Sequence, residues 1–333
     1  MSETLNVAIV GCGLIGQKRA KSLAGGCLSA CADKDLPSAE RLAKTFSNCF
    51  PTTDYRQAIE FPGVSMVIVA TPHNLLAEIT AYAINAGKNV LVEKPGARYV
   101  NELRPLVDMA KEKGVLVRVG FNHRYHRAFQ KARKIIDDGF LGPLMFLRAR
   151  YGHGGRIGYD TEWRATPEIS GGGELIDQGV HLIDLARWFL GDFQETKGLA
   201  RTFYWNMPVD DNAFLLLQTE RSQVAFLHAS CTEWKNTFSF ELYGSKGKLH
   251  IEGLGGSYGV ERLSWYRMLP EMGPPETTIW EYPMADNSWD VEMNEFIEDI
   301  RLNRFPSAGL SDAISALEIV DKIYKESGYD YRT

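Results

Sequence analysis

The sequence predicts an α/β chain in which a parallel sheet is followed by a second domain of α+β type. Up to Asn122, short apolar runs alternate with helical segments, which is typical of right-handed βαβ crossovers. After Asn122, apolar runs follow one another with short polar turns between them, which is typical of an antiparallel sheet. A glycine-rich turn follows the first apolar run. We therefore expect two domains, residues 1–122 and 123–333.

The first expected strand, residues 7–10, leads directly into a G-x-G-x-x-G sequence. Gly11 allows a tight turn, Gly13 lets the backbone approach a pyrophosphate, and Gly16 lets the following helix pack closely on the strand. The N-terminus of that helix would face the anion. Because the motif lies between a strand and a helix, it predicts a Rossmann dinucleotide-binding domain.

An acidic residue ends the second expected strand, residues 27–32. Asp33 lies 22 residues after Gly11, where a carboxylate can accept hydrogen bonds from the adenosine ribose hydroxyls. It would repel a 2′-phosphate, so we expect NAD rather than NADP. Lys34 has the opposite tendency, because a cation there could meet a phosphate. The alternative is that Asp33 is only a turn residue.

The remaining elements are expected in chain order. The first domain has further expected helices at 39–46, 55–59, 77–86 and 100–113, and strands at 64–70, 89–92 and 115–119. The second has expected strands at 144–151, 209–219, 222–231, 237–243 and 248–252, and helices at 123–138, 289–303 and 311–326. Residues 254–287 are rich in Gly and Pro and are expected to be loop with strand pieces.

Polar residues follow several strands of the first domain, where parallel sheets bind their ligands. Thr71 and Pro72 follow one strand, Glu93 and Lys94 follow the next, and Asn122 comes after the last. One cofactor cleft is therefore expected to collect residues that are far apart in sequence. Lys94 could be an ordinary surface cation, but at this strand end it would face the nicotinamide and could exchange a proton there.

The composition limits the classes of function. A formal net charge of −5 over 333 residues argues against a general nucleic-acid binder. No apolar run is long enough to span a membrane, and residues 1–5 are too short for a signal peptide, so a cytoplasmic protein is expected. The five cysteines form no C-x-x-C pair and are expected as reduced thiols. The seven histidines show no zinc pattern, so no metal site is expected.

A glycine triplet at 171–173 precedes the chemical residues of the second domain. The apolar periodicity after it predicts a helix that ends at Gly191. Asp177 and His181 are four residues apart and would share one face of this helix. A carboxylate beside an imidazole fixes its tautomer or holds a proton near neutral pH. The alternative is a solvated helix face with an incidental pair, because D-x-x-x-H is a common pattern.

Taken in order, the glycine motif, Thr71-Pro72, Glu93-Lys94-Pro95 and the D-x-x-x-H helix resemble the glucose–fructose oxidoreductase/inositol dehydrogenase family (Gfo/Idh/MocA). The resemblance covers essentially the whole chain. It implies a Rossmann domain followed by an open, mostly antiparallel sheet that often mediates oligomerisation. It also implies NAD- or NADP-dependent oxidation or reduction of alcohol carbons in sugars, cyclitols and related compounds.

The same resemblance places Lys94, Asp177 and His181 at the catalytic positions, and Trp163-Arg164 at the family's Trp-Arg pair near the cofactor. One departure is that Leu76 stands where the family often has a histidine, while His73 lies earlier. The full set of expected cofactor residues is Gly11, Gly13, Leu14, Ile15, Gly16, Asp33, Lys34, Thr71, Pro72, His73, Glu93, Lys94, Asn122, Trp163 and Arg164.

The expected reaction is reversible hydride transfer between nicotinamide C4 and a carbinol carbon. His181 would be the main general acid or base, Asp177 would orient it, and Lys94 would hydrogen-bond the same substrate oxygen. The alternative from another class is a dinucleotide-binding sensor without turnover, against which the intact catalytic set argues.

Cations, aromatics and glycines gather between Arg148 and Arg164, directly before the D-x-x-x-H helix. Arginine forks suit phosphate, and aromatic faces suit a base or a sugar ring. This favours an anionic sugar, above all a nucleotide-linked one, over a free cyclitol or hexose. The alternative is that Arg148 and Arg150 lie on the solvent face of a strand. The expected substrate residues are Lys94, Arg124, Tyr151, Arg156, Asp177 and His181, and the expected assembly is a homodimer or homotetramer formed through the C-terminal sheet.

Overall fold

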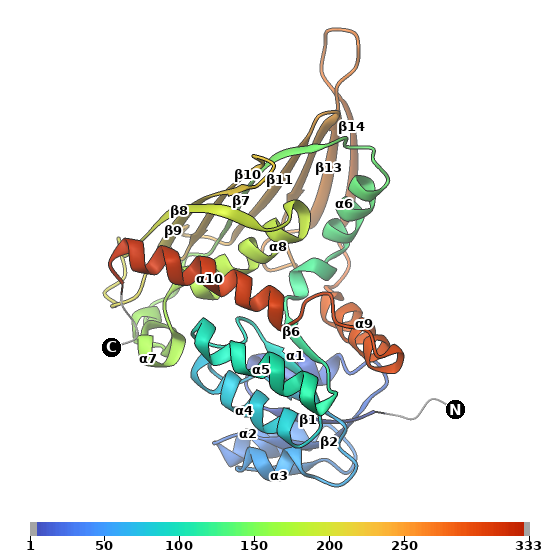
Figure 1. The fold of residues 1–333 in the computed structure, drawn as a ribbon, viewed down its shortest axis with the longest axis vertical. Helices are drawn as coiled ribbons and strands as arrows, with labels where there is room; N and C mark the ends of the chain where they lie inside the picture. The colour runs from blue at the N-terminus through green and yellow to red at the C-terminus, as the bar shows by residue number, and fades with distance from the viewer. Residues whose placement is uncertain (1–4, 330–333) are drawn as a thin grey trace. The chain divides into compact units, whose positions relative to one another are not determined.

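The computed structural model describes residues 5–329, and the chain forms two compact units (Figure 1). The first unit contains the residues up to Phe121 together with Trp289–Ile314. The second contains Asn122–Ser288 and the residues from Ser315 onward. The sequence-based division assigned all of 123–333 to the second domain, whereas the segment Trp289–Ile314 returns to the first unit. Within residues 5–329, no helix has the length and apolar character needed to cross a bilayer.

The first unit is built on a six-stranded parallel sheet with the order β3-β2-β1-β4-β5-β6. Its strands run along the apolar segments that the sequence marks, with one short addition, β3. Their bounds are β1 Asn6–Val10, β2 Cys27–Ala32, β3 Phe50–Thr52, β4 Met66–Val69, β5 Asn89–Glu93 and β6 Val117–Gly120. The strand order reverses beside β1, which is where open α/β sheets bind ligands.

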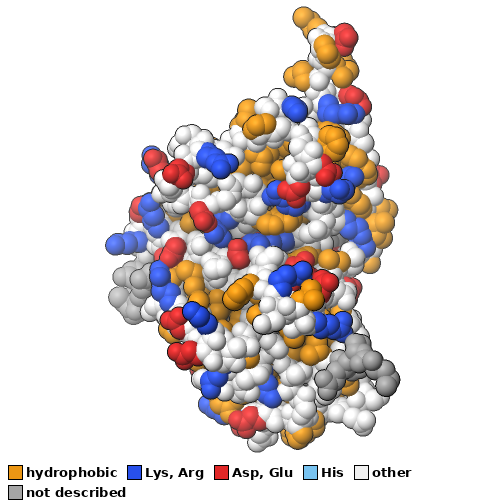
Figure 2. All heavy atoms as spheres, turned by 45° about the vertical axis from the view of Figure 1, so that its right-hand side comes forward, with side chains coloured by type: hydrophobic (Ala, Val, Ile, Leu, Met, Phe, Trp, Pro, Cys, Tyr) orange, Lys and Arg blue, Asp and Glu red, His pale blue; other side chains and the backbone are white. Residues whose placement is uncertain are grey.

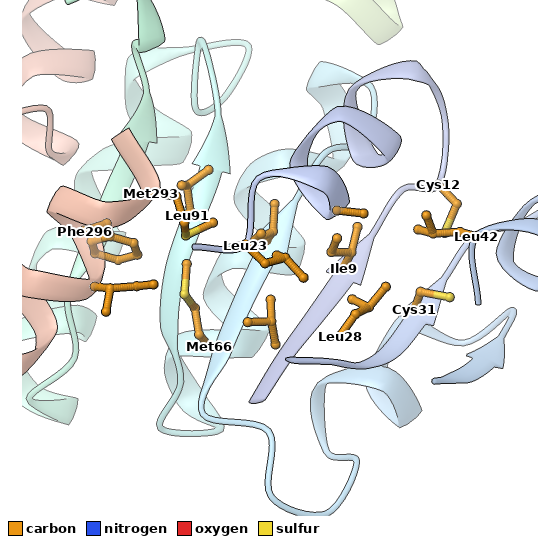
Figure 3. Close-up of a cluster of buried hydrophobic side chains, with 14 of the residues drawn as sticks. Ile9, Cys12, Leu23, Leu28, Cys31, Leu42, Met66, Leu91, Met293 and Phe296 are labelled. Carbon is orange, nitrogen blue, oxygen red and sulfur yellow. The ribbon is translucent and has the colours of Figure 1, made fainter. Parts of the chain in front are cut away.

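Helices cover this sheet, and one of them comes from the far end of the sequence. They are α1 Leu14–Lys21, α2 Leu36–Ala43, α3 Tyr55–Ile59, α4 His73–Asn85, α5 Val100–Lys113 and α9 Ser288–Leu302. Asp35 and Asp54 cap α2 and α3 through their side chains, as expected for acidic N-cap residues. Figure 3 shows Met293 and Phe296 of α9 in the same buried cluster as Ile9, Leu28 and Leu91. The C-terminal segment therefore completes the core of the first unit.

The second unit is built on an eight-stranded sheet with the order β14-β13-β12-β11-β7-β10-β9-β8. Only the β7–β10 pair is parallel among its neighbouring strands, so the expected mostly antiparallel sheet is confirmed. The bounds are β7 Leu144–Gly152, β8 Phe193–Arg201, β9 Asn212–Thr219, β10 Val224–Ser230, β11 Thr237–Gly244, β12 Gly247–Glu252, β13 Glu261–Arg267 and β14 Glu276–Tyr282. Residues 254–287, expected mainly as loop, contain the whole of β13 and β14.

One face of this sheet is covered and the other is open. Helices α6 (Arg127–Asp137) and α8 (Val180–Leu190) pack on the covered face, and α10 (Leu310–Ser327) reaches the second unit through its later turns (Figure 1). Side chains alternate along the strands, so Leu147, Ala149 and Tyr151 of β7 are buried while the residues between them are exposed. The loop between β13 and β14 projects beyond the sheet.

Candidate active site

The glycine-rich turn of the first unit has the geometry that a dinucleotide requires. Gly11 has φ 96°, and a Cβ there would lie 2.4 Å from the Ala70 carbonyl oxygen. A Cβ on Gly16 would lie 1.9 Å from the carbonyl oxygen of Gly11. A Cβ on Gly13, by contrast, would meet nothing within 4 Å. Packing thus requires the first and third glycines, while the second leaves open space at the N-terminus of α1, where a pyrophosphate fits.

The Asp33 side chain links this turn to the end of β2 through hydrogen bonds. Its Oδ2 accepts a hydrogen bond of 2.8 Å from the backbone N–H of Cys12, and its Oδ1 accepts one of 3.0 Å from Asp35 N–H. The carboxylate is half-buried, whereas Lys34 beside it is exposed. The negative charge therefore has a fixed position next to the glycine turn.

Other expected cofactor residues gather at the same edge of the sheet. Strands β1, β2, β4 and β5 pair in register with Val10 beside Ala32 and Val69, and Val69 beside Val92. The residues that follow these strands therefore share one edge. At this edge Leu14 is exposed, Ile15, Thr71, Pro72 and Lys94 are half-buried, and His73 is buried as the first residue of α4.

Glu93 has a structural partner that the sequence motif did not reveal. Arg19 Nε lies 2.6 Å from Glu93 Oε1, and Arg19 Nη1 lies 2.5 Å from Glu292 Oε2. The guanidinium also lies 4.3 Å from the ring centre of Trp289. All three charged side chains are buried, so the Arg19 guanidinium joins α1 to Glu93 at the end of β5 and to Glu292 of α9. The role of Glu93 in cofactor binding remains a prediction from the sequence.

The second unit holds Asp177 and His181 on one buried segment. Leu175–Gly179 is a π-helical turn, and α8 continues from it. Such turns are frequent at functional sites. Asp177 is 4% exposed and His181 is 5% exposed, which excludes the alternative of a solvated helix face. Arg164 Nε donates a 2.9 Å hydrogen bond to Asp177 Oδ2, and this carboxylate raises the pKa of Arg164.

Aromatic rings enclose His181. Its imidazole is stacked on that of His123, with ring centres 3.8 Å apart, and both lie edge-on to the Tyr151 ring. Tyr258 contacts Tyr151 from the loop before β13, with ring centres 5.1 Å apart. Burial raises the pKa of Tyr151 well above its ordinary value and that of Tyr258 to about 12, so both hydroxyls stay protonated near neutral pH.

A buried carboxylate, Glu174, lies one helical turn before Asp177. Its Oε1 accepts a 2.8 Å hydrogen bond from the Tyr159 hydroxyl and lies 3.3 Å from His153 Nε2. Burial is the largest single influence on His153 and disfavours its charged form, but the hydrogen bond to Glu174 and the negative charges of Glu174 and Asp177 together outweigh it and raise the pKa of His153. Glu174 Oε2 is buried and has no hydrogen-bond partner within residues 5–329. Sequence reasoning missed His123, His153, Glu174 and Tyr258, because their partners are remote in sequence.

The cations between Arg148 and Arg164 do not gather at one site, contrary to the expectation from the sequence. Arg148 and Arg150 lie on the open face of β7, opposite to Tyr151, and Arg148 pairs with Glu241 and the Tyr243 hydroxyl. The alternative of a solvent-facing strand position is therefore correct for these two arginines.

The remaining expected substrate and cofactor residues of the second unit also have partners. The buried Arg124 forms two hydrogen bonds of 2.8 and 2.5 Å with Asp184, and the exposed Arg156 pairs with Glu162 at 2.6 Å. Asn122 Nδ2 donates to Ser288 Oγ at 3.0 Å, and Arg164 lies over the Trp163 ring.

Comparison with known proteins identifies the family of the chain. Residues 5–121 match the oxidoreductase family with an NAD-binding Rossmann fold, and residues 129–250 match the GFO/IDH/MocA C-terminal domain. The chain belongs to the Gfo/Idh/MocA family. As a member it is an oxidoreductase that uses NAD, as the sequence predicted.

Relatives in this family are enzymes. Levoglucosan dehydrogenase of Pseudarthrobacter phenanthrenivorans is 27% identical over 287 residues, which cover 74% of this chain and 73% of that protein. The scyllo-inositol 2-dehydrogenase (NAD(+)) of Bacillus subtilis is 25% identical, covering 96% and 93% of the two chains. The solved structure of levoglucosan dehydrogenase in complex with NADH has a TM-score of 0.88 at 23% identity, covering 98% and 97%. This likeness confirms the two-sheet fold.

Proposed function

We propose that the protein is an NAD-dependent dehydrogenase or reductase that acts on a CH–OH carbon of a neutral sugar or cyclitol. The observation that carries this proposal is the burial of both Asp177 and His181, with His181 against the rings of His123 and Tyr151 and with the buried carboxylate of Glu174 on the same segment. Aromatic faces suit the apolar faces of a sugar ring, and buried acceptors suit its hydroxyls. Named relatives act on levoglucosan and on inositol.

The proposed mechanism divides the work among three side chains. Bound NAD supplies the hydride acceptor or donor. His181 takes the hydroxyl proton during oxidation and returns it during reduction. Asp177, held by the Arg164 guanidinium, orients the acid/base group and accepts a hydrogen bond from a neighbouring hydroxyl. Lys94, from the first unit, hydrogen-bonds the reacting oxygen and stabilises negative charge that develops on it.

A neutral substrate is favoured over a nucleotide-linked one because the candidate phosphate ligands are already engaged. Arg124 is committed to Asp184, Arg148 to Glu241, and Arg156 to Glu162. Binding a diphosphate would require breaking ion pairs, one of them buried. The competing proposal is supported by a relative of 29% identity over 76% of both chains, the dTDP-3,4-didehydro-2,6-dideoxy-alpha-D-glucose 3-reductase of Saccharopolyspora spinosa.

Turnover over a substrate panel tests the proposal. Purified protein with NAD⁺ is offered levoglucosan, inositols and simple glucosides, and with NADH it is offered oxidised dTDP-, UDP- and GDP-sugars. We expect NADH formation with a neutral polyol, and about 10²-fold slower formation when His181→Ala replaces the native protein. Turnover confined to nucleotide sugars would contradict the neutral-substrate proposal. NADH binding without turnover of either class would instead indicate a sensor.

We further propose that the open face of the second sheet binds a second copy of the chain. Phe146, Leu216 and Phe226 are exposed on this face, and Met268 and Met272 are exposed on the β13–β14 loop. Figure 2 shows hydrophobic side chains on the projecting β13–β14 loop. A face of this kind is costly to leave in water. Light scattering after size-exclusion chromatography should give a dimer or tetramer, and Phe226→Asp should reduce the assembled fraction.

A further inference from the structure

Three thiols of the first unit lie around the base of the glycine-rich turn. The sulfur atoms of Cys31 and Cys49 are 3.7 Å apart. Cys12, between the first two glycines, directs its thiol to the Ala32 carbonyl oxygen at 3.5 Å. Figure 3 shows Cys12 and Cys31 near Leu42 at one end of the buried cluster. All are free thiols, and Cys31 is two residues before Asp33.

The two nearest thiols differ in access to solvent. Cys31 is fully buried in β2, and its thiol donates to the Ala39 carbonyl oxygen at 3.3 Å. Cys49 is half-buried and follows an exposed turn in which Asn48 adopts a φ of 64°. An oxidant can therefore reach Cys49 first, while Cys31 is already adjacent to resolve the product.

We propose that Cys31 and Cys49 form a peroxide-sensitive pair whose disulfide weakens NAD binding. The Cys31 thiol and burial raise the pKa of Cys49, so in the first step the small deprotonated fraction of Cys49 attacks one oxygen of a peroxide. The O–O bond breaks, a sulfenic acid forms, and the departing hydroxide takes up the thiol proton as water. In the second step the Cys31 sulfur attacks the Cys49 sulfur. The S–O bond breaks, the S–S bond forms, and the second water leaves with the Cys31 proton. The two sulfurs lose two electrons, which the peroxide gains.

The location of the pair connects this oxidation to the cofactor. A disulfide needs the sulfurs about 2.0 Å apart, so they must approach from 3.7 Å. Cys31 would leave the Ala39 carbonyl and move within a close-packed core. The same strand carries Asp33, whose carboxylate holds the Cys12 N–H of the glycine turn. The shift therefore reaches both the ribose-facing carboxylate and the pyrophosphate turn.

Thermodynamic linkage gives the proposal a second consequence. If the disulfide weakens NADH binding by some factor, bound NADH must disfavour the disulfide by the same factor. Two independent measurements therefore have to agree. Neither uses turnover, so they do not depend on the proposed sugar substrate and remain informative if that proposal fails.

The test forms the disulfide in the full-length protein with hydrogen peroxide, brings it to equilibrium in a glutathione redox buffer with and without saturating NADH, and then alkylates the free thiols. Peptide mass spectrometry should find Cys31 linked to Cys49, and less of the linked peptide when NADH is present. The dissociation constant of NADH for the oxidised protein should rise by at least about fivefold, a typical coupling between sites. Dithiothreitol should restore it.

Cys49→Ser should abolish both the linked peptide and the affinity change. Cys27→Ser is the matched control, because Cys27 is the exposed thiol of the same strand, and it should behave as the native protein. Oxidation confined to Cys27, with Cys31 and Cys49 both alkylated, would overturn the proposal. A Cys31–Cys49 disulfide that leaves NADH affinity unchanged would also overturn it.

Discussion

The imidazole of His181 lies flat against that of His123, with ring centres 3.8 Å apart and planes inclined by 29°. Both rings are buried, so the stack restricts the orientations open to His181. We expect His123→Ala to lower kcat about tenfold, because small displacements of a catalytic group are costly. His123→Phe keeps a flat ring and should retain more activity. If both variants had the steady-state kinetics of the native protein, the proposed role of His123 in positioning His181 would be refuted.

The proposed catalytic set predicts large losses of rate with small losses of cofactor affinity. Lys94→Ala and His181→Ala should each lower kcat by about 10²-fold, the usual scale for a positioned acid or base. NADH fluorescence titration should give nearly native dissociation constants for both. Near-native turnover of either variant would show that its role is wrongly assigned.

Asp33 predicts a preference for NADH over NADPH of at least about tenfold, or roughly 1.4 kcal/mol. Asp33→Asn separates the two effects of this side chain. The amide removes the charge that repels a 2′-phosphate but can still accept a hydrogen bond from the Cys12 N–H. The ratio of NADPH affinity to NADH affinity should therefore rise in the variant, while NADH itself binds more weakly because the single amide oxygen cannot also accept from Asp35 N–H. Equal binding of NADH and NADPH by the native protein would indicate that Lys34 outweighs Asp33.

The buried carboxyl group of Asp210 should make the stability of the second unit depend on pH. Burial raises its pKa to about 7, although hydrogen bonds from Tyr324, Leu175 and Gly173 favour the ionised form. Because the folded-state pKa exceeds the unfolded value, the folded state binds the proton more tightly. Its stabilising contribution is thus present at low pH and is lost as pH rises toward 7.

This dependence is measurable by urea unfolding at several pH values. The slope from Asp210 cannot exceed about 1.4 kcal/mol per pH unit. Asp210→Asn should flatten the profile between about pH 4 and pH 7, the range set by the unfolded and folded pKa values. Asp108→Asn, an exposed change on α5, serves as the control and should leave the profile unchanged. An identical profile for Asp210→Asn would contradict the assignment.

Among substitutions in the first unit, replacing Arg19 should cause the largest loss of stability. Arg19→Met would leave two buried carboxylates, Glu93 and Glu292, without their cation. Breaking a buried ion pair in this way costs about 3–5 kcal/mol. Thermal unfolding should show a clear decrease in the midpoint, whereas Arg41→Met, on the exposed surface of α2, should not.

The sequence contained enough to predict the parallel sheet, the glycine turn and the helical segment that carries both Asp177 and His181, because each rests on local spacing. The faces of β7 were also readable, since Arg148 and Arg150 alternate with Tyr151 and must point away from it. The burial of the Asp177 segment was not readable, because it depends on rings from 123, 151 and 258. The β13–β14 pair was hidden by the glycines and prolines around it.

The return of α9 to the first unit has a consequence for synthesis. Glu292, which neutralises Arg19, follows it by 273 residues, and Met293 and Phe296 complete the core around Ile9 and Leu91. During synthesis, the buried Arg19 of the cofactor-binding unit therefore becomes fully paired only after nearly the whole chain has been translated. A fragment that stops at residue 121 should bind NADH poorly and be degraded rapidly in cells, even though it contains every strand of the sheet.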